Sequence, residues 1–143
     1  MIRNTIAFLA GLGITFLLIV GIESLGHAIY PVQAGVDFSD PDAMRAYVAT
    51  LPIPALLFPL AAYFIATFVG VIVASLIGTL RAIVFAAVIG LFVLAGTIAN
   101  LLLIPHPLWF AVLAILGIAV SAWLAAELAG RRAAEPSDDV LDA

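Results

Sequence analysis

Two polar side chains near the end of the first long apolar run could act together. In the stretch "GIESLGHAIYP", Gly21 to Pro31, Glu23 and His27 lie four residues apart, so a helix places the carboxylate and the imidazole on one face. Such a pair can serve acid-base chemistry, form a paired helix end, or supply two ligands of a metal ion.

A second stretch, "NLLLIPHPLWF", carries the other polar groups of interest. A proline on each side of His106 restricts the backbone, so this imidazole lies on a short, rigid turn. Asn100 precedes the turn, and Trp109, a residue type typical of membrane interfaces, follows it. Below, the outer polar cluster means Glu23, His27, Asn100, His106 and Trp109.

Three interpretations of the outer polar cluster are open. In the first, Glu23 and His27 pair along the helix, His106 faces water or head groups, and nothing is bound. In the second, Glu23, His27 and His106 hold Zn or Cu, for which a carboxylate and two imidazoles are suitable ligands. In the third, the cluster recognises a lipid head group or a partner protein.

The composition indicates that lipid surrounds this chain. Of its 143 residues, 66% are hydrophobic and 10% are charged, whereas about a quarter of the residues in soluble domains are charged. The net charge of −4 and the scattered arginines argue against nucleic acid as a partner. Because Cys is absent, thiol catalysis, disulfides and thiolate metal sites are excluded. We expect no cofactor.

Four apolar segments predict an all-α protein with transmembrane helices over about 5–27, 53–80, 82–104 and 107–129. Each can cross a hydrocarbon core of about 30 Å, and none alternates like a barrel strand. We expect one domain, residues 1–132, built as a transmembrane four-helix bundle. At 1.5 Å per residue, Glu23 and Asn100 lie about 27 Å along their helices, at the outer boundary.

The middle of the predicted bundle has no titratable side chain. Thr15, Thr67, Thr97 and Gly117 lie at that depth. Ion-coupled and proton-coupled transporters usually have a carboxylate or a broken helix there, and so do the four-helix small multidrug transporters, whose acid is deep. A transporter is therefore the second choice, as a small oligomeric transporter or channel.

The arginines predict the orientation of the chain. Arg3, Arg81, Arg131 and Arg132 lie on one side of the membrane, which places both termini in the cytoplasm of a bacterial inner membrane. The outer loop 28–52 holds a predicted interfacial helix that begins at Pro41 after a capping Ser39 or Asp40. The acidic tail, 133–143, is predicted to be disordered in the cytoplasm.

Small residues at helical spacing predict where the helices meet. A proline at position 59 should also kink the second span. The small-residue stripes serve either packing within the bundle or a homo-oligomer. Their members are Gly70, Ala74, Gly78, Ala86, Gly90, Gly117, Ser121 and Ala125.

The stretches "GIESLGHAIYP", "DPDAMRAYVATLP" and "PHPLWF" together resemble small uncharacterised bacterial integral membrane proteins with four helices. The resemblance covers most of the chain and implies the same topology, with no catalytic residue. The sequence thus predicts a non-enzymatic accessory or structural membrane subunit, whose partners are the lipid bilayer and a homo-oligomer or larger membrane complex. A metal-dependent membrane enzyme is the third choice.

Overall fold

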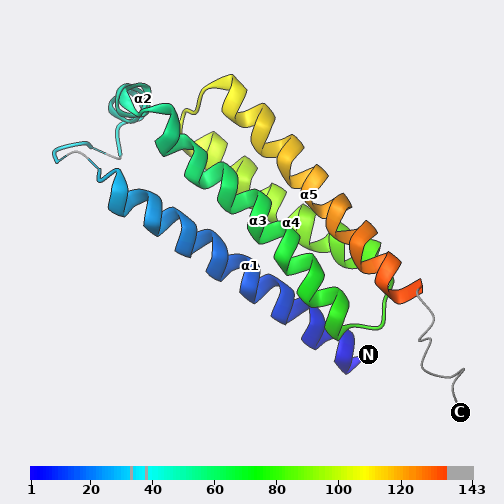
Figure 1. Ribbon diagram of the computed structural model, residues 1–143. Coiled ribbons are helices and arrows are strands. Elements are labelled where there is room, and N and C mark those ends of the chain that lie inside the picture. The colour runs from blue at the N-terminus through cyan, green and yellow to red at the C-terminus, as the bar shows by residue number, and fades with distance from the viewer. Residues whose placement is uncertain (33, 38, 135–143) are drawn as a thin grey trace, which may run out of the picture.

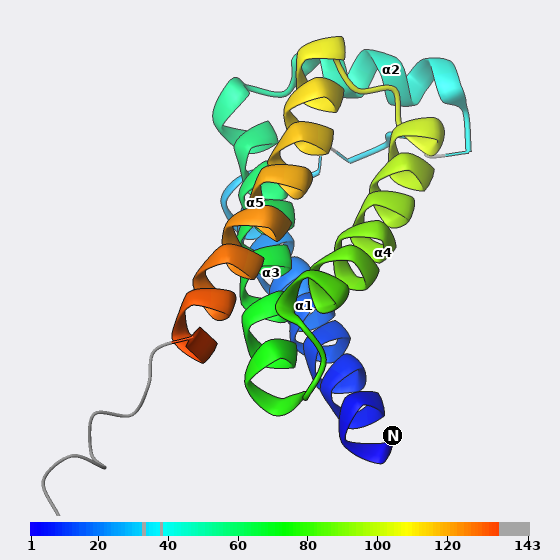
Figure 2. The same cartoon turned by 90° about the vertical axis from the view of Figure 1, so that its right-hand side faces the viewer.

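The computed structural model describes residues 1–32, 34–37 and 39–134, and these form five α-helices and no strand (Figure 1, Figure 2). The helices are α1 (Ile2–Ile29), α2 (Pro41–Thr50), α3 (Ile53–Ile77), α4 (Ala82–Leu103) and α5 (Leu108–Ala134).

Four of these helices, α1, α3, α4 and α5, are long and apolar enough to cross a membrane. Large apolar side chains cover their outer surface: Leu9 exposes 65% of its area, Phe16 64% and Leu91 65%. Hydrocarbon is the solvent that tolerates such a surface. The chain is therefore a multi-pass membrane protein, and the four predicted spans are confirmed.

The two ends of the bundle differ. The short helix α2 lies across the end at which α1 stops and α4 turns into α5 (Figure 2). We call this the α2 end. The opposite end, here the terminal end, carries the N-terminus, the turn from α3 to α4 and the end of α5 (Figure 1).

The start of α2 follows from its first residues. The side chain of Asp40 caps the helix by accepting a hydrogen bond from the backbone N–H of Asp42 at 2.9 Å, and Pro41 occupies the first turn. Met44 and Val48 are buried on its inner side. The short helix predicted in this loop is thus confirmed, and Asp40 is its cap.

The central helix of the bundle is α3. It packs against α1, α4 and α5, and α4 also packs along α5. By contrast, α1 packs mainly on α3 and touches α4 only slightly. The bundle is therefore uneven, with α1 attached to one side of the other three helices.

The contact between α1 and α3 is a close approach of two backbones. A Cβ on Gly11 would lie 2.8 Å from the Gly70 carbonyl oxygen, and a Cβ on Gly70 would collide with the Thr15 hydroxyl. That hydroxyl donates to the Gly11 carbonyl at 2.7 Å and lies 3.2 Å from the Ala66 carbonyl. Small residues let helices come this near in lipid, where packing drives their association.

The predicted small-residue positions face neighbouring helices. A side chain at Gly78 would meet the ring of Phe85, and one at Gly90 would meet Ala122 at 3.3 Å. Ala74, Ala86 and Ala125 are buried.

On α5, the Ser121 hydroxyl donates to the Phe64 carbonyl at 2.6 Å and ties this helix to α3. Gly117 lies more loosely, since a Cβ there would be 4.0 Å from Phe64. Gly117 is thus the least closely packed of the eight predicted positions.

The turn after α3 determines where that helix ends. The helix stops at Ile77 and not at residue 80, because the next residue, Gly78, is extended. The Thr79 N–H and hydroxyl donate to the Asn4 side-chain oxygen at 2.8 and 3.0 Å. The Arg3 guanidinium donates to the Ile77 carbonyl. These bonds hold the start of α1 beside the turn.

The first and the last helix, α1 and α5, are longer than predicted. α1 runs from Ile2 to Ile29, where Pro31 follows, and α5 continues to Ala134. Two arginines in the last turn of α5 suit the negative end of the helix dipole. Residues 133 and 134 thus belong to a helix, and the rest of the predicted tail, 135–143, lies outside the described residues.

Three threonines and one serine supply the buried hydroxyls in the middle of the described spans: Thr15, Thr67, Thr97 and Ser121. Thr67 donates to the Tyr63 carbonyl one turn earlier at 2.7 Å, while the Thr97 oxygen has no partner. A hydroxyl bonded within its own helix adds little cost in lipid.

The glycine contact predicts opposite effects at two positions of α1. Gly11→Ala should lower stability by about 1–3 kcal/mol, because the methyl group meets a backbone carbonyl that cannot move aside. Gly13→Ala should be neutral or raise stability by up to about 1 kcal/mol, because open space surrounds Gly13 and alanine favours helix. Thermal unfolding in detergent measures both, and equal effects would contradict the contact.

Candidate functional site

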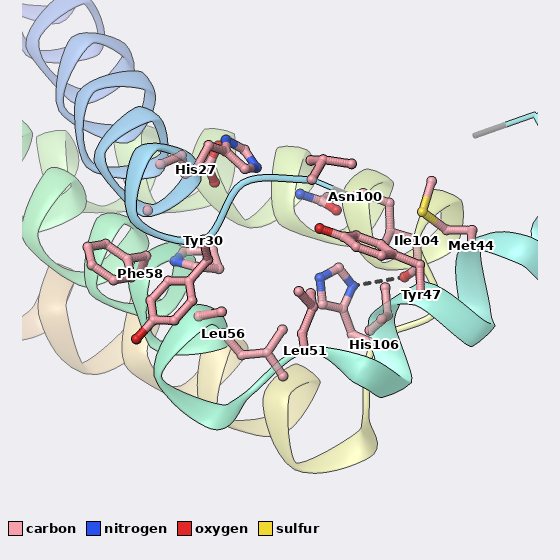
Figure 3. Close-up of a pocket in the computed structure, with 16 residues that line it drawn as sticks. His27, Tyr30, Met44, Tyr47, Leu51, Leu56, Phe58, Asn100, Ile104 and His106 are labelled. Carbon is pink, nitrogen blue, oxygen red and sulfur yellow. Dashed lines mark hydrogen bonds between the residues drawn. The ribbon is translucent and has the colours of Figure 1, made fainter. Parts of the chain in front are cut away.

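A cavity of about 240 Å³ lies at the α2 end of the bundle. Side chains from α1, α2, α3, α4 and the turn between α4 and α5 line it (Figure 3). Most are apolar or aromatic, among them Met44, Val48, Leu51 and Phe58. We call it the α2-end cavity.

Four members of the outer polar cluster line this cavity: Glu23, His27, Asn100 and His106. The tight turn thus does bring His106 to the same cavity as the end of α1. Trp109 is the exception, because its ring packs edge-on against Phe110 at 6.1 Å between centroids and stays partly exposed. It serves as an interfacial side chain beside the site.

Glu23 and His27 do not form an ion pair, although they are four residues apart. No contact of 4.0 Å or less joins their charged atoms. The Glu23 carboxylate instead interacts with the Tyr63 hydroxyl of α3. The Asn100 amide donates to the same hydroxyl at 3.0 Å. Three helices are therefore joined by one short chain of polar groups.

Tyr63 was missed in the sequence-based prediction. The sequence carries a usable signal, because this tyrosine lies well inside an apolar span and has a hydroxyl. The structure shows that the side chain is buried. A buried tyrosine hydroxyl needs a partner, so its depth indicates polar groups on neighbouring helices at the same level.

One atom of this chain of polar groups has no partner in the protein. The Asn100 side-chain oxygen is buried and accepts no hydrogen bond. A buried carbonyl oxygen without a donor costs about 1–3 kcal/mol. Because Asn100 lines the α2-end cavity, this oxygen is a candidate acceptor for a bound molecule.

His106 is fixed by two contacts. Its Nδ1 lies 2.8 Å from the Ile104 carbonyl (Figure 3). Its ring stacks on Phe110 with centroids 4.4 Å apart. Burial lowers the pKa of His106 below its ordinary value, and the bond to Ile104 offsets part of this shift. The ring is therefore neutral at pH 7, and Nδ1 carries its proton because a carbonyl can only accept.

The three residues of the metal interpretation are not grouped as ligands. Among the described residues, no three His, Cys, Asp or Glu side chains are placed to share a metal ion. His27 and His106 lie toward opposite sides of the α2-end cavity (Figure 3). His106 is held by Phe110 and Ile104, so it cannot turn toward α1 without losing both contacts.

Comparison of the chain with protein-family models, curated proteins and solved structures gives no match.

A second cavity, of about 620 Å³, lies at the terminal end. It is lined by Arg81, Trp123, Glu127 and Arg131, and the last two form an exposed pair at 3.9 Å. No residue of the outer polar cluster lines it.

The environment of His106 predicts acid sensitivity. Because its pKa is lowered in the fold, the folded state binds fewer protons than the unfolded state. The contribution of neutral His106 to the free energy of unfolding is fully present above the ordinary histidine pKa of about 6.5. It is lost as the pH falls below that value. Thermal unfolding temperatures should therefore decrease below about pH 6.5.

The variant His106→Asn should make that decrease smaller, because asparagine can still donate to Ile104 but does not titrate in this range. An unchanged pH dependence in the variant would show that other groups cause it. Glu23, His27, Tyr30 and Tyr47 are the other titratable side chains on the same cavity.

Proposed function

We propose that this protein is a non-enzymatic accessory membrane protein that holds the head of a small amphipathic molecule in the α2-end cavity. The supporting observation is that one cavity joins polar groups of α1, α4 and the α4–α5 turn with apolar side chains of α2 and α3. Ligand sites commonly combine an apolar lining with a few converging polar groups.

The size of the cavity supports a head group and not a whole lipid. Its volume of about 240 Å³ is below the roughly 300–1,000 Å³ of pockets that enclose a drug-sized molecule. A head group and its first carbons fit such a volume, while the rest of an apolar chain would extend into the bilayer.

Binding is a better match to the lining than covalent catalysis. Among the described residues that line the cavity there is no Ser, Thr or Cys. The polar side chains Asn100 and His106 are each oriented by a hydrogen bond to the protein. Such preorganised groups favour recognition, because they lose little freedom when a ligand arrives.

A transporter receives less support. The described side chains buried at the middle of the spans offer hydroxyls and no charge. Transporters that couple to ions or protons usually place a charged or broken element at this depth.

The arginine bias supports a bacterial inner membrane with the α2 end outside. The chain has no Cys, so a Ser39→Cys variant carries a single thiol in the loop before α2. In intact cells this thiol should react with a membrane-impermeant maleimide, whereas a Gly130→Cys variant should react only after lysis. The reverse pattern would reject the orientation.

An accessory role also implies a larger membrane complex or a homo-oligomer, held together through the lipid-facing surface. Native mass spectrometry of material extracted from its own membrane measures this directly. A single monodisperse monomer would count against the accessory role and leave the binding role standing.

The binding role predicts the location of a photoreactive probe. A ten-carbon fatty alcohol with a diazirine near its hydroxyl should modify residues of the α2-end cavity, with Glu23, His27 and Tyr47 on the labelled peptides. Ala55→Trp should abolish this labelling, because the indole fills the cavity that Ala55 lines.

Gly13→Trp is the matched control, since open space surrounds Gly13 on the outer face of α1. It should leave the cavity labelling intact. Labelling spread evenly over all four spans, and unchanged by Ala55→Trp, would remove the cavity as a binding site.

A further inference from the structure

We propose that the α2-end cavity selects a head group that donates hydrogen bonds, a hydroxyl or an amine, and rejects an anionic head group. This rests on the proposed binding function and specifies its ligand. The inference follows from assigning each proton among the polar groups that line the cavity.

The first acceptor follows from the hydrogen bonds that join Glu23, Tyr63 and Asn100. A carboxylate only accepts, so the Tyr63 hydroxyl must give its proton to Glu23. The oxygen of Tyr63 is then free to accept, which matches the bond from the Asn100 amide nitrogen at 3.0 Å. This orients the Asn100 amide and leaves its oxygen as the group without a donor. Asn100 therefore offers an acceptor to the cavity.

The second acceptor comes from His106. Its Nδ1 proton is used by the Ile104 carbonyl at 2.8 Å. In a neutral imidazole the other nitrogen, Nε2, has a lone pair and no proton. Figure 3 shows the Nδ1 bond directed away from the ring toward Ile104, which leaves the opposite edge of the ring for the cavity.

A third acceptor follows from a proline. Pro59 lies inside α3 and has no N–H, so the carbonyl of Ala55, one turn earlier, lacks its usual helical donor. Both Ala55 and Pro59 line the α2-end cavity. The proline inside α3 thus has a chemical consequence, because it leaves a backbone carbonyl beside the cavity without its helical donor.

The charge of the lining points the same way. Among the described residues that line the cavity there is no Lys or Arg, and Glu23 is the acid. An anionic head group would have to leave water without a cationic partner, which is costly. His27 and Tyr30, which also line the cavity, can donate or accept, so they do not oppose this preference.

The test uses five probes with the same ten-carbon chain. Monodecanoylglycerol has two free hydroxyls, and its dimethyl ether has none. Decylamine has N–H donors, and decyltrimethylammonium keeps the charge without them. Decyl phosphate is the anion. Native mass spectrometry of the purified full-length protein measures the dissociation constant of each probe.

We expect monodecanoylglycerol or decylamine to bind at least about tenfold more tightly than its methylated counterpart, because two lost hydrogen bonds at 0.5–1.5 kcal/mol each amount to such a factor. The two pairs of probes separate a hydroxyl ligand from an amine ligand. Decyl phosphate should bind more weakly than both donors.

Substitutions of Asn100 and His106 test whether their acceptor atoms cause the preference for a donor head group. Asn100→Leu should reduce the preference for the donor over its methylated form, and His106→Phe, which keeps the stacked ring, should do the same. Ser24→Ala, on the exposed side of α1 next to Glu23, should keep the full preference. Thermal unfolding shows which variants are folded.

Equal binding of donor and methylated probes, abolished by Ala55→Trp, would overturn this inference while the binding function survives. Tighter binding of decyl phosphate would also overturn it. If no probe binds in a manner that Ala55→Trp changes, both the inference and the binding function fail.

Discussion

The backbone contact between α1 and α3 is the interaction on which the rest of the fold depends. α1 has α3 as its main neighbour, so its position is set almost entirely by this one interface. Gly11 and Gly70 allow the approach near the terminal end, and Gly26 allows a second one nearer the α2 end, where a Cβ would lie 2.8 Å from Phe58. Two such points define both the distance between α1 and α3 and their axial register, which is the position of one helix along the other.

That register determines the chemistry at the α2 end. Glu23 lies twelve residues beyond Gly11, which is about 18 Å along a helix. In the antiparallel partner, Tyr63 lies seven residues before Gly70, which is about 10 Å along the helix. The long side chain of Tyr63 spans the remaining distance and takes up the carboxylate. A register shifted by one residue would rotate Glu23 by about 100° away from α3. The polar groups of the cavity thus meet because glycines far from them lock the two helices.

Lipid as solvent explains where the remaining polar groups are found. Within hydrocarbon, each polar group has to find a partner inside the protein. Thr15, Thr67 and Ser121 bond to backbone carbonyls and so add little polarity to the spans. Among the described residues, three buried side-chain oxygens have no partner, on Ser75, Thr97 and Asn100. Of these three residues, Asn100 lines the α2-end cavity.

Much of the fold was predictable because it depends on local rules. Long apolar runs determine the spans, and a capping Asp40 followed by Pro41 determines the start of α2. Helix ends were less accurate, since contacts between distant residues decide them. Thr79, for example, is held by Asn4, seventy-five residues earlier in the chain.

The sequence by itself determined that this protein crosses a membrane four times and that its acids, arginines and histidines gather at the ends of the spans. It also determined that Glu23, His27, Asn100 and His106 lie at one depth, because depth follows from residue counting. Only the tertiary structure decided which of them interact. Glu23 meets Tyr63 and forms no ion pair with His27, and His106 lines the cavity while bound to Ile104. The physical reason is that depth is a property of one helix, whereas partners depend on how each helix is rotated against the next.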